Sequence, residues 1–234
     1  MKTELGSIAL DCLQELPWWP DLVKYHTRTP SIGCSFPDYW TLYRTLRRLR
    51  PAEVLECGTG TSTVVIAHAL RQNATQGYPG HLTTLEESPY YAAIHDRLFP
   101  SVLRPFVTAL VRDRADGVFS CFRGTRYQDV PDRPYTFVFV DGPNPAALAD
   151  GALVANLDFL DVVGKSAQPV LGLIDGRLTT VFLLQSVLPA GLARYHAETS
   201  MTRVGPCQRT DLAQLDLKAL SRLNRHTGEK VVLR

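Results

Sequence analysis

The chain has 234 residues, of which 45% are hydrophobic, enough for one α/β domain with a sizeable core. Charged residues make up 21% and the formal net charge is +2, which excludes a disordered chain and a strongly basic nucleic-acid-binding protein. The one dense arginine cluster, within residues 41–50, is interspersed with leucines at helical spacing. We interpret it as a solvated helix face and expect no nucleic-acid partner.

The cysteines and the apolar runs indicate a soluble, cytoplasmic protein. The five cysteines are widely spaced, odd in number and without a C-x-x-C pair, which favours reduced thiols over a disulfide framework or a zinc site. Acidic residues interrupt the apolar stretch at the N-terminus, so we predict no signal peptide. No apolar run approaches the roughly 20 residues of a membrane span, and we expect no membrane partner.

Residues 1–38 are rich in proline and aromatic residues and show little periodicity. We predict that they form an N-terminal helical appendage to a main domain of residues 39–234. A helix from about Tyr39 to Leu49, ended by Pro51, is expected to begin that domain.

Apolar strands then alternate with helical segments. The predicted strands are residues 53–56, 81–87, 135–143 and 169–176, and the predicted helices are residues 62–70, 88–99, 146–163 and 177–188. The strand at 135–143 has a nearly continuous apolar run, as expected for a central strand covered on both faces. The alternation predicts an α/β fold with a mostly parallel sheet and helices on both faces.

Two regions depart from this alternation. Residues 105–113 and 117–127 are β-like and meet at Asp116-Gly117, so we expect an antiparallel hairpin that turns there. Towards the C-terminus, residues 193–201 and 229–234 are candidate strands, with a helix predicted at 211–223.

Acidic residues recur where the predicted strands end. Glu56 precedes Gly58 and Gly60 after the first strand, and Glu86 follows the second. Asp141 and Asp175 follow the two later strands. Because ligands of such sheets bind outside the carboxyl ends of the strands, we interpret these positions as the candidate site.

The glycine loop does not fit the phosphate-binding patterns. A Walker loop needs a lysine, which is missing, and a dinucleotide loop needs a third glycine where Thr63 stands. Glu56 would also face the negative charge of a pyrophosphate. It suits instead a ligand with an ammonium and a sulfonium, such as S-adenosylmethionine. The glycines permit close approach of the backbone, and Glu86 can accept hydrogen bonds from both ribose hydroxyls.

Three motifs resemble the ligand loops of class I S-adenosylmethionine-dependent methyltransferases: "VLECGTGTST" (54–63), "LTTLEES" (82–88) and "FVFVDGP" (137–143). More narrowly, they resemble the branch related to catechol O-methyltransferase. That branch accepts a hydroxyl residue, here Ser62, where the general pattern has a third glycine. The resemblance covers roughly residues 38–190, and the three motifs in order are more specific than any one alone.

The resemblance implies a Rossmann-like three-layer sandwich with a mostly parallel sheet of seven strands, the last antiparallel. It implies S-adenosylmethionine as the cofactor, with Gly58 and Gly60 at its methionine end and Ser62 beside them. It further implies that Glu56 lies near the amino group and that Glu86 holds the ribose.

The resemblance also places the catalytic residue, Asp141, beside the transferred methyl group, as a metal ligand or as an electrostatic element. Asp175 would be the second acid of a Mg²⁺ site. In the metal-dependent members an asparagine follows this second acid, whereas Gly176 follows here, so the third oxygen ligand is missing unless Asn144 replaces it. The residue that contacts adenine stays open among three candidates: Asp113, Tyr127 and Asp129.

Several of these residues also have ordinary structural interpretations. Ser62 is equally suited to cap a helix, and we interpret Glu87 as solvated. Asp141 and Asp175 each precede a glycine, a common turn pattern. His68 and His95 lie in predicted helices, where we interpret both as surface or packing residues.

We therefore expect a methyltransferase that uses S-adenosylmethionine and acts on an oxygen atom of a small-molecule acceptor. One alternative is a non-catalytic binding or assembly module with the same fold. Another is an NAD-dependent oxidoreductase, which the acid before the glycines and the missing third glycine disfavour. The acceptor and a homodimeric state stay open at this stage, since acceptor pockets are built from variable loops.

Overall fold

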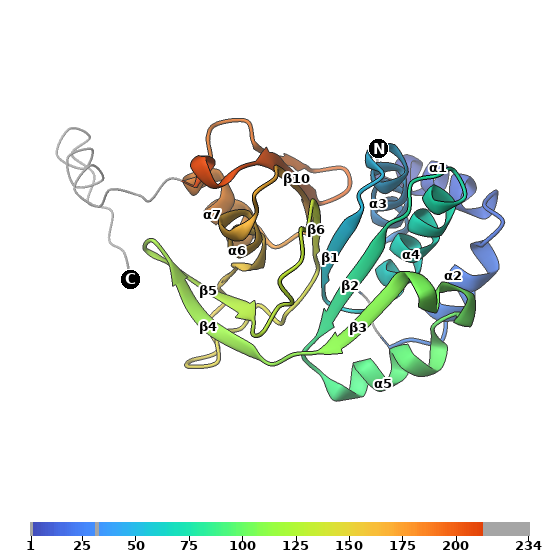
Figure 1. Cartoon of the computed structure of the whole chain (residues 1–234), viewed down its shortest axis with the longest axis horizontal. Coiled ribbons are helices and arrows are strands. Elements are labelled where there is room, and N and C mark those ends of the chain that lie inside the picture. The colour runs from blue at the N-terminus through green and yellow to red at the C-terminus, as the bar shows by residue number, and fades with distance from the viewer. Residues whose placement is uncertain (1, 31–32, 213–234) are drawn as a thin grey trace.

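The computed structural model describes residues 2–30 and 33–212. Its main feature is a seven-stranded sheet with the order β3-β2-β1-β6-β8-β10-β9 (Figure 1). The strands are β1 (Glu53–Cys57), β2 (His81–Glu86), β3 (Val107–Val111), β6 (Phe137–Val140), β8 (Val170–Ile174), β9 (Ala193–His196) and β10 (Met201–Cys207). The strands from β3 to β8 pair in parallel, and β10 is antiparallel to both of its neighbours. The predicted Rossmann-like sheet with its last strand antiparallel is confirmed.

Helices cover both faces of the sheet and make three layers. They are α1 (Lys2–Gln14), α2 (Trp19–His26), α3 (Phe36–Leu49), α4 (Thr61–Ala74), α5 (Pro89–Leu98), α6 (Asp158–Lys165) and α7 (Leu178–Val187). Helices α1 to α5 lie on one side of the sheet and α6 and α7 on the other (Figure 1). Two short 3-10 helices, η1 (Ser101–Phe106) and η2 (Arg209–Asp211), complete the helical elements of the described residues.

The central strand β6 shows why both faces are covered. Side chains alternate across a strand, so Phe137 and Phe139 enter the core beneath α3 and α4, while Val138 and Val140 enter the core beneath α6 and α7. All of these side chains are at most 1% exposed. The predicted central strand, with its nearly continuous apolar run, is confirmed.

The N-terminal segment contributes to the main core. Leu13 and Leu22 are fully buried in the same cluster as α3, α4 and β6, and Trp18 stacks on His68 of α4 with ring centroids 4.8 Å apart. Helix α3 begins at Phe36, so the boundary that we expected between residues 38 and 39 lies inside a helix. His68 is 2% exposed and packs against the N-terminal segment, as one of its two interpretations had it.

The helix predicted at 146–163 is wrong over most of its length, because only α6 (Asp158–Lys165) forms. The preceding residues form a loop and the two-residue strand β7 (Ala155–Asn156), which pairs with β5 of the hairpin. A side chain distant in sequence provides hydrogen-bond partners for the backbone of this loop. The Asp116 carboxylate accepts hydrogen bonds from the backbone nitrogens of Leu148 and Ala149 at 2.7 and 3.0 Å. These partners override the helical pattern of the segment.

The hairpin exists, but its predicted turn and partner are wrong. Strands β4 (Arg114–Phe119) and β5 (Phe122–Tyr127) turn at Ser120, which has a positive φ of 55°, and not at Asp116-Gly117. Gly117 lies inside β4 opposite Gly124. Residues 105–113 were expected to pair with residues 117–127. They contain β3, which instead extends the main sheet in parallel with β2.

The late elements differ in part from the prediction. Residues 193–201 contain β9 and the first residue of β10, which pair with each other instead of forming one strand. The helix predicted at 211–223 lies outside the described residues except for its first two positions, and the strand predicted at 229–234 lies wholly outside them. No helix in the described ranges is long and apolar enough to cross a membrane.

Candidate functional site

The chain reverses its direction of growth across the sheet between β1 and β6. It runs from β1 outward to β2 and β3, then returns to place β6 on the other side of β1. In doubly wound sheets the ligand lies at the carboxyl ends of the strands beside this reversal. The predicted site residues Glu56, Glu86, Asp141 and Asp175 all lie at this edge, at or directly after the ends of their strands.

Gly58 is the point where the β1 and β6 loops meet. Its φ of +100° is a conformation that favours glycine, and a Cβ atom here would lie 2.9 Å from the backbone nitrogen of Gly142. Gly60 precedes α4 as its N-cap residue. The glycines therefore permit a close backbone approach, as predicted, and the partner of Gly58 in this structure is the loop after β6.

Glu56 holds the first turn of α4. It is fully buried, and its two carboxylate oxygens accept hydrogen bonds from the hydroxyls of Ser62 and Thr63 at 2.6 and 2.7 Å. Burial raises the pKa of Glu56 to about 7, and the hydroxyl hydrogen bonds oppose that shift. Its contact with a ligand amino group stays a prediction. The capping interpretation of Ser62 is wrong, because Gly60 is the N-cap and Ser62 donates to Glu56 instead.

Glu86 lies at the end of β2 with 8% of its surface exposed. Its oxygens accept hydrogen bonds from the backbone nitrogens of Thr59 and Ser88 at 3.3 and 2.9 Å. Burial raises the pKa of this carboxyl group. Glu86 borders a cavity of about 340 Å³ whose lining also includes Thr59, Phe99 and Leu110. Since each carboxylate oxygen accepts two hydrogen bonds, Glu86 retains acceptor sites for a ligand.

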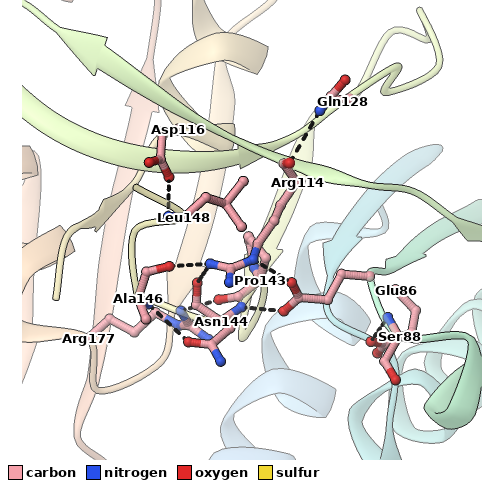
Figure 2. A network of polar contacts seen from close by, with 11 residues as sticks. Glu86, Ser88, Arg114, Asp116, Gln128, Pro143, Asn144, Ala146, Leu148 and Arg177 are labelled. Carbon is pink, nitrogen blue, oxygen red and sulfur yellow. Dashed lines mark hydrogen bonds and ion pairs between the residues drawn. The ribbon is translucent and has the colours of Figure 1, made fainter. Parts of the chain in front are cut away.

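Glu87 is not solvated as expected; it links the hairpin to the loop after β6. Its carboxylate accepts a hydrogen bond from the backbone nitrogen of Asn144 at 2.6 Å and pairs with Nε of Arg114 at 2.7 Å. Arg114 also donates to the carbonyls of Asn144 and Ala146 (Figure 2). The Asn144 side-chain oxygen accepts from the backbone nitrogen of Ala146 at 2.9 Å, a local turn contact. The network holds the loop that follows Asp141.

Arg177 joins the two strand ends that carry the aspartates. Its guanidinium donates to the carbonyl of Pro143 at 2.6 Å (Figure 2) and also to the carbonyl of Asp141. It therefore holds the backbone of the β6 loop against the start of α7, while its charge opposes the rise in the Asp141 pKa.

Asp141 and Asp175 lie together, as predicted, and they lie beside Cys34 and Asp38, which the sequence did not indicate. The Cys34 thiol donates to Oδ2 of Asp141 at 3.6 Å. Ligand atoms of Cys34, Asp38 and Asp175 lie within 4.8 Å of one another. Burial, then the nearby charge of Asp175, raises the pKa of Asp141. The motif S-x-x-D at Ser35 signals a helix start, but no sequence signal shows that this start lies over the ends of β6 and β8.

The expected Mg²⁺ site does not match these side chains. Mg²⁺ prefers six oxygen ligands in near-octahedral geometry. Here a thiol lies against Asp141 and within the donor cluster, and Asn144, the candidate third ligand, directs its side-chain oxygen to Ala146. We therefore assign no step to Mg²⁺.

The three candidates for an adenine contact differ in position. Tyr127 is 3% exposed, and its hydroxyl lies 2.8 Å from the place where a Cβ of Gly142 would stand. Asp113 and Asp129 are exposed. Tyr127 therefore packs against Gly142 in the loop after β6.

No family model matches the chain, and no curated protein matches it in sequence. Among solved structures, the SAH-bound methyltransferase PaMTH1 of Podospora anserina matches with 16% identity, 78% of this chain, 63% of that chain and a TM-score of 0.40. The structure of yhhF of Escherichia coli, named as a candidate methyltransferase, matches with 15% identity, over 77% of this chain and 90% of that chain, with a TM-score of 0.43. A mutant of MtNAS in complex with S-adenosylmethionine matches with 10% identity, over 86% of this chain and 70% of that chain, with a TM-score of 0.39. Similarity at this level assigns no activity to the chain.

Proposed function

We propose that this protein is an S-adenosylmethionine-dependent methyltransferase that acts on an oxygen atom of a small molecule. The observation that carries the proposal is the sheet edge itself. The glycine loop after β1, the carboxylate of Glu86 after β2 and Asp141 after β6 lie side by side at the reversal point. The antiparallel strand β10, placed between β8 and β9, distinguishes this sheet from the six-stranded dinucleotide-binding order.

The proposed roles follow from these positions. Glu86 accepts hydrogen bonds from the ribose hydroxyls, and Gly58 and Gly60 lie at the methionine end. Asp141 lies beside the sulfonium methyl group. The acceptor oxygen attacks the methyl carbon in line with the departing sulfur, so the carbon–sulfur bond breaks as the carbon–oxygen bond forms. S-adenosylhomocysteine leaves as a neutral thioether, and the hydroxyl proton of the acceptor passes to solvent. Such a reaction depends mainly on holding the two reactants in line.

The proposal extends to the branch related to catechol O-methyltransferase, which Ser62 in place of a third glycine supports. The cysteine spacing and composition support a cytoplasmic enzyme whose partner is a small-molecule acceptor, with no nucleic acid or membrane involved.

Calorimetry with S-adenosylhomocysteine tests the cofactor role of Glu86. We expect Glu86→Ala to lose about 10- to 100-fold in affinity, because it removes the hydrogen bonds to both ribose hydroxyls. An analogue without the 2′ and 3′ hydroxyls should bind the variant and the parent protein equally. The matched control is Asp132→Ala, an exposed acid in the segment before β6, at the opposite end of that strand from the site. Equal loss for both ligands would refute the ribose contact, and binding of NAD alone would refute the proposal.

The thiol beside Asp141 favours a second candidate, a binding module that keeps the fold without turnover. Incubation with methyl-labelled S-adenosylmethionine and panels of hydroxyl acceptors separates the two. Label in a product supports the enzyme, whereas tight S-adenosylhomocysteine binding without transfer to any acceptor supports the module.

A further inference from the structure

Four side chains from three distant segments meet beyond the ends of β6 and β8. Cys34 directly precedes Ser35, the N-cap of α3, and Asp38 lies in the first turn of that helix, while Asp141 follows β6 and Asp175 follows β8. One ligand atom each from Cys34, Asp38 and Asp175 lies within 4.8 Å of the other two, and the Cys34 sulfur lies 3.6 Å from Oδ2 of Asp141. Cys34 and Asp38 are 8% and 6% exposed.

The carboxylates of this cluster form no ion pair with a protein cation among the described residues, although the charge of Arg177 acts on Asp141 from nearby. The hydrogen bonds of the nearby Arg177 guanidinium go to backbone carbonyls. Carboxylates gathered in a partly buried place are unfavourable unless protons or a cation neutralise them.

One buried oxygen of the cluster has no partner. Oδ2 of Asp38 accepts hydrogen bonds from the backbone nitrogen and the hydroxyl of Ser35 at 2.7 and 2.6 Å. Oδ1 of the same carboxylate is buried and has no hydrogen-bond partner in the described structure. Such an atom costs free energy unless a ligand satisfies it, and this independently indicates a bound species.

The donor types select the kind of ion. A thiolate with carboxylates suits Zn²⁺, which takes sulfur at about 2.3 Å and carboxylate oxygen at about 2.0–2.2 Å in a tetrahedron. Those bond lengths place neighbouring ligand atoms roughly 3.5 Å apart, so the cluster has to contract by about an ångström to enclose the ion. Mg²⁺ prefers oxygen ligands, so the thiol is an unfavourable ligand for it.

We infer that Cys34, Asp38 and Asp175 bind one Zn²⁺ ion or a divalent cation of similar softness, with a fourth position left for water or a ligand oxygen. The Cys34 thiol gives its proton to solvent when the ion binds. Binding of the ion does not depend on the proposed methyl transfer, because it is measured without S-adenosylmethionine. Where that transfer also holds, the fourth position suits an acceptor that carries a hydroxyl oxygen, next to Asp141.

Cobalt titration of the full-length, chelator-treated protein tests the site. Co²⁺ replaces Zn²⁺ in such sites, and a thiolate ligand adds an intense charge-transfer band in the near ultraviolet. We expect this band to saturate at one equivalent of Co²⁺, to disappear on addition of Zn²⁺, which binds more tightly, and to persist in excess Mg²⁺.

Variants assign the band to its residue. Cys34→Ser should abolish the band, whereas Cys121→Ser, which alters an exposed free thiol on the hairpin turn, should leave it unchanged. Asp175→Asn should weaken Zn²⁺ binding about 10- to 100-fold in calorimetry. Asp175 is partly exposed and is the variant of choice, because Asp38 also supports the start of α3. Absence of the band in the parent protein, or its persistence in Cys34→Ser, would overturn the inference.

Discussion

Replacing Gly58 by alanine should destabilise the protein through two separate effects. The φ of +100° imposes backbone strain on any residue with a side chain, worth about 1–3 kcal/mol. The new Cβ would lie 2.9 Å from the backbone nitrogen of Gly142 and 3.2 Å from the carbonyl carbon of Asp141. Backbone atoms cannot rotate away as a side chain can, so overpacking adds about 1–3 kcal/mol. We expect a total loss of about 2–6 kcal/mol in the free energy of unfolding.

Gly77→Ala is the matched control. Gly77 has a φ of +83°, but no atom lies within 4 Å of its added Cβ, so it carries the backbone strain alone. Urea unfolding of the two variants, with an unchanged denaturant slope, measures the difference. A Gly58→Ala protein that is no less stable than Gly77→Ala would refute the contact between the β1 and β6 loops, and with it the assembly of the site around Gly58.

Three further variants test the surroundings of the site. Burial raises the Glu56 pKa from 4.5 to about 7, so its ionisation lowers stability as the pH rises through that window, by at most about 1.4 kcal/mol per pH unit. Glu56→Gln should remove this slope from unfolding measured across the window, and an unchanged slope would contradict the assignment. Trp18→Ala should cost about 3–5 kcal/mol by calorimetric melting, because the ring is 5% exposed and stacks on His68; a loss below about 1 kcal/mol would separate the N-terminal segment from the core. Arg114→Ala should cost about 1–3 kcal/mol and speed amide exchange in residues 144–149, since Arg114 pairs with Glu87 and bonds this loop. Unchanged exchange there would mean that the hairpin does not hold the loop.

The parts of the fold that could be predicted rest on local patterns. The apolar run of β6 and the strand that precedes Gly58 are recognisable because a buried parallel strand needs only its own continuous hydrophobic residues. The Pro89 start of α5 is likewise a local signal. Acids placed after such strands reach one edge of a parallel sheet, which is why the sequence predicts that Glu86 and Asp141 belong to one site.

The prediction fails where distant segments decide the local structure. Residues 146–157 have a helical pattern, yet the Asp116 carboxylate from the hairpin binds their backbone and no helix forms there. Nothing in the sequence indicates that Glu87 has an ion-pair partner. Arg114 lies 27 positions away, and it comes close to Glu87 only because the chain turns after β3. Such contacts depend on the path of the chain in space.

The sequence alone determined the parallel strands β1, β2, β6 and β8, the helices α4, α5 and α7, and the acidic residues at the strand ends, because these follow from hydrophobic periodicity and strand direction. Only the tertiary structure decided what those acids meet. It turned Glu56 inward onto Ser62 and Thr63, and it brought Cys34 and Asp38 from the N-terminal segment onto Asp141 and Asp175. The spacing of the cysteines argued against a zinc site because ligand motifs in sequence are local, whereas this cluster is assembled by packing α3 over the ends of β6 and β8.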